Sequence, residues 1–195
     1  MALYQNTVVD SDLLTLGNWK IQVATYDSAY TSYSSVASAC DNLGAGILNS
    51  FTHTPTFYDV QAGNAPDPIE GIADEVCEAT GELIELGVAK FASAWGGILT
   101  TATAITTTLA VLSAGGKTAQ TPKTYLFTNR RVVNSASVET NIVIWKGYMK
   151  VGFAANFKSD NDADPITVYP FTIEGVIDGT RTAGNQLFAV YKWLD

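Results

Sequence analysis

The chain has 195 residues, 47% of them hydrophobic and 15% charged, and carries a formal net charge of −8. This length and apolar content suffice for one hydrophobic core, so we expect a single domain over 1–195. No apolar run approaches the roughly 18 residues of a membrane-spanning helix, and no signal-peptide pattern follows Met1, so we expect neither feature.

The charge is unevenly distributed along the chain. Residues 1–97 hold 12 acidic side chains against Lys20 and Lys90, a net charge of −10, whereas 98–195 hold 9 basic and 7 acidic side chains, a net charge of +2. Because affinity for nucleic acid comes mainly from neutralising phosphates, the acidic half is poorly suited to bind DNA or RNA. Solubility alone would also explain this charge.

The first forty residues give few strong signals. Residues 1–16 have no clear period and predict an arm or a peripheral strand. Residues 19–24 alternate large apolar with polar side chains, which predicts a strand. The Ser-, Thr- and Tyr-rich stretch 25–42 is typical of a surface loop with short extended pieces.

The stretch 46–83 predicts a long β-hairpin. Alternation in its first arm puts Ile47, Phe51 and His53 on one side, and Pro55 predicts an edge strand or a bulge because it lacks an N–H donor. The Gly-, Pro- and Asp-rich turn 61–71 is too long for a tight hairpin and predicts a projecting loop.

The return arm could be helix or strand. As a helix, it would place Asp74, Glu78 and Glu82 at i, i+4 spacing with no lysine to relieve their repulsion. It would also place Gly81 mid-helix, at a cost of ~1 kcal/mol. As a strand, the three acids share one face. We therefore predict a strand.

The period changes at Ile84. Ile84, Val88, Phe91 and Trp95 then form a helical stripe that ends at two glycines, which predicts one core-packing helix over 84–97.

The rest of the chain reads as strands and turns. Turns are predicted at 132–140 and 159–165 by composition, and strands at 102–114, 125–131, 141–150, 152–158, 166–178 and 187–193. About eight strands and one helix predict a mainly β fold, a sandwich or barrel of two packed antiparallel sheets with a projecting hairpin and one flanking helix.

Few residues could carry catalysis. His53 is the only histidine, and an alternating strand would place Ser50 and His53 on opposite faces, so we expect no triad. Cys40 and Cys77 match no metal spacing and are expected to be buried free thiols.

Binding motifs are also weak. The stretch 160–164 resembles the start of a calcium loop, but Pro165 stands where that loop needs glycine and Phe171 where it needs glutamate. The glycine pairs at 96–97 and 115–116 form no phosphate-binding loop. We therefore expect no enzyme, no catalytic residue, no cofactor and no metal.

The second half of the chain has an ordered series of segments. An apolar strand ends in a charged pair, and a strand with lysines and aromatics follows; the series closes on a proline-containing strand and a near-terminal apolar strand. The segments are YLFTNRR (125–131), NIVIWKGYMK (141–150), NFKSDND (156–162), DPITVYPFTIEGVIDGTR (164–181) and NQLFAVYKW (185–193).

This series resembles the major tail tube proteins of tailed bacteriophages, a family related in fold to type VI secretion tube proteins. The hairpin followed by a glycine-ended helix is similar as well, so the resemblance covers most of 17–193, with 98–116 departing from it. It implies a structural virion protein of the phage tail, assembled in the host cytoplasm. Two β-sheets would pack across one another with a flanking helix.

The resemblance also implies partners. Six copies would form a ring, and rings would stack into the tube through which DNA is ejected without being specifically bound; no membrane is involved. Sheath, tape-measure, baseplate and tail-terminator proteins are candidate further partners.

The resemblance assigns roles to the hairpin. Asp74, Glu78 and Glu82 would face the lumen, where like charge keeps phosphates from sticking. The loop that contacts the next ring would include Gln61, Asn64, Asp67 and Glu70. The alternative is a head-decoration or other β-rich virion accessory module, which has no need of a one-signed arm. A small hydrolase or lectin-like domain is a third hypothesis.

Overall fold

The computed structural model describes residues 18–60, 69–84, 87–96, 99–102, 111–133, 136–159 and 166–194. The predicted arm at 1–16 and residues 160–165 of the predicted turn at 159–165 lie outside these ranges, as do the loop residues Gln61, Asn64 and Asp67.

The described chain is mainly β, as predicted. Its elements are β1 (Trp19–Thr25), α1 (Tyr33–Ala39), β2 (Asp41–Val60), β3 (Ile69–Leu83), α2 (Val88–Ala94), β4 (Leu99–Ala102), β5 (Val111–Ala114), β6 (Lys123–Val133), β7 (Ala136–Met149), β8 (Tyr169–Gly175) and β9 (Phe188–Leu194).

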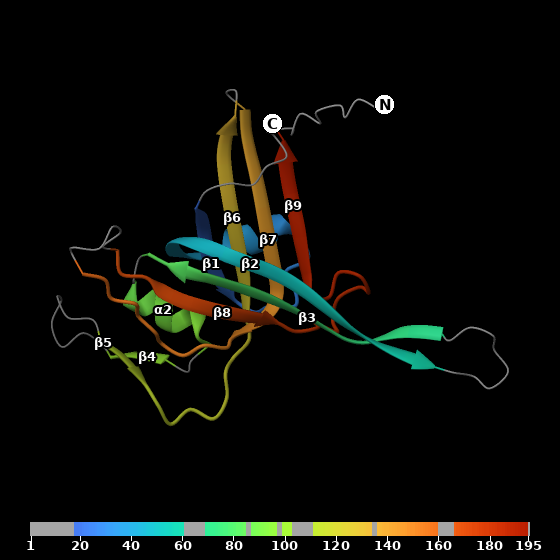
Figure 1. Ribbon diagram of the computed structural model, residues 1–195, viewed down its shortest axis with the longest axis horizontal. Helices are drawn as coiled ribbons and strands as arrows, with labels where there is room; N and C mark the ends of the chain where they lie inside the picture. Colours follow the sequence, from blue (N-terminus) through green and yellow to red (C-terminus); the bar gives the residue numbers. More distant parts are fainter. Residues whose placement is uncertain are drawn as a thin grey trace, which may run out of the picture.

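Seven strands form one antiparallel sheet in the order β6-β1-β2-β3-β8-β7-β9. β6 also pairs with β7, so the pairing of the first six strands in this order returns from β7 to β6. The seventh strand, β9, pairs with β7. The strands β6, β7 and β9 cross the direction of β2, β3 and β8 (Figure 1). In the described part of the chain, seven strands thus form one sheet and β4 and β5 form a separate two-stranded sheet, so the predicted packing of two large sheets is not confirmed.

The core lies between these two crossing sets of strands and α2. Its largest buried side chains include Tyr125, Phe127, Ile144, Phe171 and Ile173. In β3, Cys77, Ala79 and Leu83 are buried on one face while Glu78 is exposed on the other, which confirms the strand prediction for 72–83.

The predicted helix at 84–97 is shorter than expected. Helix α2 spans Val88–Ala94, with Gly87 at its N-cap. Ile84 lies before it because its N–H donates to Ala45 O and so continues the strand pairing. The rings of Phe91 and Trp95 stack with centroids 3.9 Å apart and are almost fully buried, so the core-packing role of these two residues is confirmed.

Helix α1 corrects the prediction of a loop at 25–42. Ser32 caps it in a reciprocal capping box with Ser35, and Val36 is fully buried against Leu126, Val143 and Trp145. The capping box and one apolar stripe stabilise this seven-residue helix: Tyr33, Val36, Ala37 and Cys40, spaced i, i+3, i+4 and i+7, all pack on this cluster.

Two predicted boundaries in the second half are also wrong. The predicted turn at 132–140 is mostly strand, because β6 runs to Val133 and β7 starts at Ala136, with Arg130 opposite Glu139. The predicted strand at 152–158 has only an isolated bridge between Asn156 and Val168, so it lacks the continuous partner that a strand needs.

The predicted strand at 102–114 is likewise corrected. Its ends belong to β4 and β5, which pair antiparallel with Leu99 opposite Ala114 and Ala102 opposite Val111.

The prediction that Ile47 and Phe51 share one side of β2 is wrong, because the register shifts between Leu48 and Ser50. Ile47 lies opposite Glu82, whereas Phe51 lies opposite Ala79, so Ile47 and Phe51 are on different faces of the sheet. A β-bulge produces this effect because one extra residue reverses the alternation. Ile47 is accordingly 40% exposed.

Candidate functional site

The outer face of β2, β3 and β8 is polar and carries the predicted acidic residues. Register places side chains of the three strands in rows across this face. One row contains Thr52, Glu78 and Glu174. The next contains Ser50, Thr80 and Thr172, where the hydroxyl oxygens of Ser50 and Thr80 are 2.6 Å apart. Neutral hydroxyls therefore separate the charged positions.

Asp74, Glu78 and Glu82 share this face because they alternate along β3 with the buried side chains of the opposite face. Asp74 and Glu78 are exposed and Glu82 is half-buried. Glu174 joins them from β8, directly opposite Glu78. Sequence reasoning did not single out Glu174, although the inward alternation of Phe171 and Ile173 places it outward.

One lysine reaches Glu174. Lys150 Nζ lies 2.7 Å from Glu174 Oε1, and both side chains are partly exposed. Such an exposed pair contributes only about 0–1 kcal/mol.

Glu70 was predicted to lie in the loop at 61–71, but the structure places it in a strand. It belongs to β3 and lies opposite Asp59, because the pairing of β2 with β3 continues from Gly46–Leu83 to Val60–Ile69. The loop between the two strands is therefore shorter than the predicted 61–71.

His53 lies on the other face of β2 from Ser50, as predicted: it is opposite Cys77, whereas Ser50 is opposite Thr80. Its Nε2 is 3.3 Å from Glu75 Oε1, and its ring packs edge-on against Phe188. These side chains line an open cavity of about 320 Å³ whose described lining includes no Ser, Thr or Cys that could act as a nucleophile. The arrangement is a partly exposed contact between His53 and Glu75 beside an aromatic ring.

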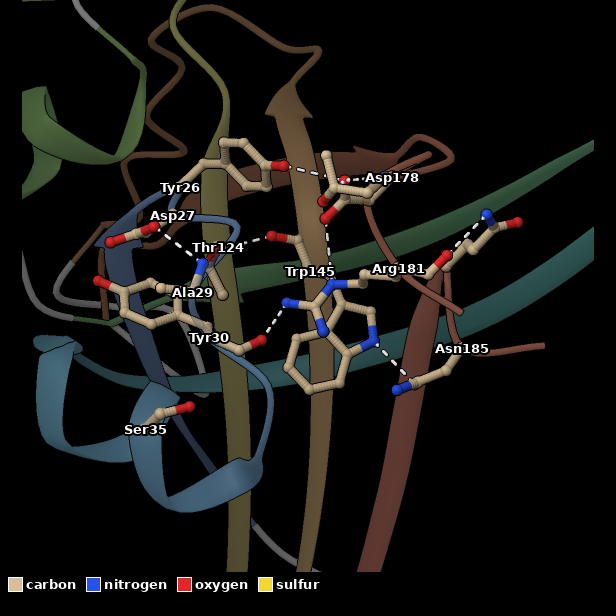
Figure 2. A network of polar contacts seen from close by, with 12 residues as sticks. Tyr26, Asp27, Ala29, Tyr30, Ser35, Thr124, Trp145, Asp178, Arg181 and Asn185 are labelled. Carbon is tan, nitrogen blue, oxygen red and sulfur yellow. Dashed lines mark hydrogen bonds and ion pairs between the residues drawn. The ribbon is translucent and has the colours of Figure 1, made fainter. Parts of the chain in front are cut away.

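A second polar cluster anchors the segment 178–186 to the sheet (Figure 2). The carboxylate of Asp178, 1% exposed, accepts hydrogen bonds from Tyr26 Oη at 2.9 Å and Thr180 Oγ1 at 2.7 Å, and pairs with Arg181 Nε at 3.0 Å. Burial alone would raise the pKa of Asp178, but the hydrogen bonds and Arg181 outweigh it and hold that pKa below its usual range.

Arg181 completes this cluster. Its guanidinium stacks 3.7 Å above the ring of Trp145 and donates to Tyr30 O, while Trp145 Nε1 donates to Asn185 Oδ1 at 3.1 Å. Every charged group is paired and buried, so the cluster fits a structural anchor better than a catalytic site.

The cysteines are not arranged for chemistry. Cys77 is buried, as predicted, whereas Cys40 is half-buried. Burial raises the pKa of each thiol to about 12. Across the described ranges, no three His, Cys, Asp or Glu residues are grouped as metal ligands would be, and neither helix has the length and apolarity to cross a bilayer.

The chain matches no protein-family model and no curated protein. The candidate site is therefore identified from the charges on the surface alone, and its strongest feature is the acidic face of β3 and β8.

Proposed function

We propose that this chain is the subunit of a bacteriophage tail tube, assembling with copies of itself into stacked rings around a channel for DNA. In this role it has no active site, and its location is the virion. The proposal rests on the resemblance in the second half of the sequence together with the surface described above.

The acidic face carries the proposal. One face of two adjacent strands carries four carboxylates: Asp74, Glu78, Glu82 and Glu174. Among the described residues, Lys150 forms an ion pair with one of them, Glu174. A channel for DNA must not bind phosphate, and repeated carboxylates on its wall repel the phosphates electrostatically. The buried opposite face of the same strands attaches this wall to the core.

Strand edges supply the means of assembly. Within the described ranges, β2 pairs with β1 only up to Gly46, so one edge of 47–60 has no partner strand. β9 pairs with β7, and no other described strand pairs with its second edge. Long unpaired edges are a liability in a monomer, whereas between subunits they can add strands to a shared sheet. In the assembled ring, the loop after β2 would contact the next ring.

Electron microscopy of the purified protein tests the proposal directly. We expect rings of uniform diameter or tubes built from them, with a central channel. A homogeneous monomer or trimer at high protein concentration would contradict the tube and favour the head-decoration alternative.

A further inference from the structure

The far ends of β2 and β3 form an exposed arm, 54–60 with 69–76, that pairs with no other strand of the described chain. It extends beyond the other strands in Figure 1. Phe57 and Ile72 lie opposite each other and are 59% and 54% exposed, and Tyr58 is 50% exposed. Large apolar side chains concentrated in this way on a monomer mark an interaction surface.

The arm is also acidic. Its two segments contain Asp59, Glu70, Asp74 and Glu75 and no lysine or arginine. Glu75 is paired with His53. A partner for the arm must therefore combine an aromatic or apolar wall with positive charge.

A groove of about 440 Å³ beside α1 has this chemistry. Its lining includes Lys20, Tyr33, Arg130 and Glu139. Arg130, Glu139 and Trp193 form one row across β6, β7 and β9, and the Trp193 ring, 39% exposed, packs 4.7 Å from that of Tyr33. The groove thus has an aromatic wall at one side.

The charges of the groove favour an acidic occupant. Glu139 accepts hydrogen bonds from Tyr33 Oη at 3.0 Å and Asn141 Nδ2 at 2.7 Å. The exposed side chains of Lys20 and Arg130 form no ion pair with a carboxylate of the described chain; Arg130 Nε donates to Ser137 Oγ at 2.8 Å. Both cations can therefore pair with incoming carboxylates.

We infer that the arm of one copy docks into the groove of a second copy, with Phe57 and Ile72 against the aromatic wall and arm carboxylates near Lys20 and Arg130. This inference rests on the proposed function and names the two surfaces that join neighbouring subunits. Complementary charge of this kind raises association rates and fixes orientation.

The contact is heterologous because the arm and the groove are different surfaces of the chain. Such head-to-tail contacts generate rings where the rotation closes and filaments where it does not. Two defective variants that each lack one surface should consequently complement each other only as pairs.

The test uses two double variants of the full chain. Lys20→Glu with Arg130→Glu removes the groove cations, and Phe57→Ser with Ile72→Ser removes the two opposed apolar side chains of the arm; all four side chains are exposed. Lys90→Glu with Lys117→Glu makes the same charge change at exposed lysines elsewhere and serves as control. Circular dichroism checks folding, and mass photometry with sedimentation velocity measures assembly.

We expect each test variant alone to associate at least about tenfold more weakly than wild type, with the control unchanged. An equimolar mixture of the two variants should form 1:1 pairs, because one intact arm and one intact groove remain.

Three results would overturn parts of this picture. Wild-type rings or tubes that neither folded variant weakens would overturn the docking and leave the tube intact. Wild-type open chains that respond to both variants but never close would support the docking and overturn the tube. A monomeric wild type would overturn both.

Discussion

Glu78 on β3 and Glu174 on β8 lie directly opposite each other on the outer face of the sheet. Like charges at directly opposed positions of an antiparallel pair destabilise it by about 0.2–1 kcal/mol. The ion pair of Glu174 with Lys150 offsets part of that cost. This unfavourable pairing agrees with the proposed channel wall, which would need negative charge even at a cost in subunit stability.

Replacing Glu78 with Gln should therefore raise the free energy of unfolding of the subunit by about 0.2–1 kcal/mol, as measured by urea denaturation. Glu82→Gln is the matched control, since Glu82 lies opposite Ile47 and Pro170 and has no like charge beside it in register. The difference between the two variants should shrink in high salt, which screens exposed charges. Equal effects of both substitutions would show that the opposed carboxylates do not repel.

Trp95 should be the most costly side chain to remove near α2. It is 1% exposed, stacks on Phe91, and donates from Nε1 to Val151 O at 2.6 Å. Trp95→Ala should lower the free energy of unfolding by about 3–5 kcal/mol. Trp95→Phe keeps an aromatic ring but loses the hydrogen bond, so it should cost less, about 1–3 kcal/mol. Wild-type melting of the alanine variant would contradict the packing of α2.

Acid should weaken the anchor at Asp178. Its pKa in the folded protein lies below the unfolded value of about 3.9, so its stabilisation is fully present above that value and is lost as pH falls through the lowered folded pKa. Asp178→Asn leaves Arg181 buried without its carboxylate and should cost about 3–5 kcal/mol at neutral pH.

Urea titrations between about pH 2 and pH 7 test this prediction, with the gap between wild type and variant expected to narrow toward the acid end. Asp27→Asn is the control, because the Asp27 carboxylate accepts a local turn hydrogen bond from Ala29 N and no other from the described chain. A gap that stays constant across this range would show that the Asp178 carboxylate does not titrate with folding.

The sequence predicts strands best where one face of the strand is buried and the other is exposed to solvent. Alternation assigned 72–83 correctly because Cys77, Ala79 and Leu83 pack inward while Glu78 stays outside. Helix α1 escaped prediction because it is only seven residues long, so its apolar stripe of Tyr33, Val36, Ala37 and Cys40 covers two turns and is interrupted by serines typical of a loop.

Long-range pairing accounts for most of the remaining misses. The opposition of Glu174 to Glu78, the return of the sheet from β7 to β6, and the Tyr26–Asp178 hydrogen bond all join segments far apart in sequence. Register shifts add to this, since the bulge between Leu48 and Ser50 depends on the partner strand and has no local signature.

Cys77 should resist thiol reagents in the folded protein. Burial raises the pKa of its thiol to about 12, so almost no reactive thiolate exists at mildly alkaline pH. In a Cys40→Ser background, a chromogenic disulfide reagent should label Cys77 only after denaturant unfolds the chain. Rapid labelling without denaturant would mean that the β3–β8 region opens far more readily than its burial implies.

If the acidic face lines the proposed channel, reversing its charge should make the channel retain DNA. Glu78→Lys with Glu82→Lys changes two outward-facing side chains and leaves the buried face of β3 untouched. Folding and assembly should therefore persist, while each subunit presents two new phosphate partners, repeated around every ring of the proposed tube.

Retention of labelled double-stranded DNA by purified tubes measures this effect, and it should fall steeply with added salt because phosphate contacts release counterions. Asp27→Lys with Asp41→Lys makes the same change in net charge away from this face and serves as control. If the two variants retain DNA equally, net charge alone is responsible. If neither retains more than wild type, Glu78 and Glu82 do not face the channel. Retention by the Glu78 and Glu82 variant alone is the result expected of a lumen wall.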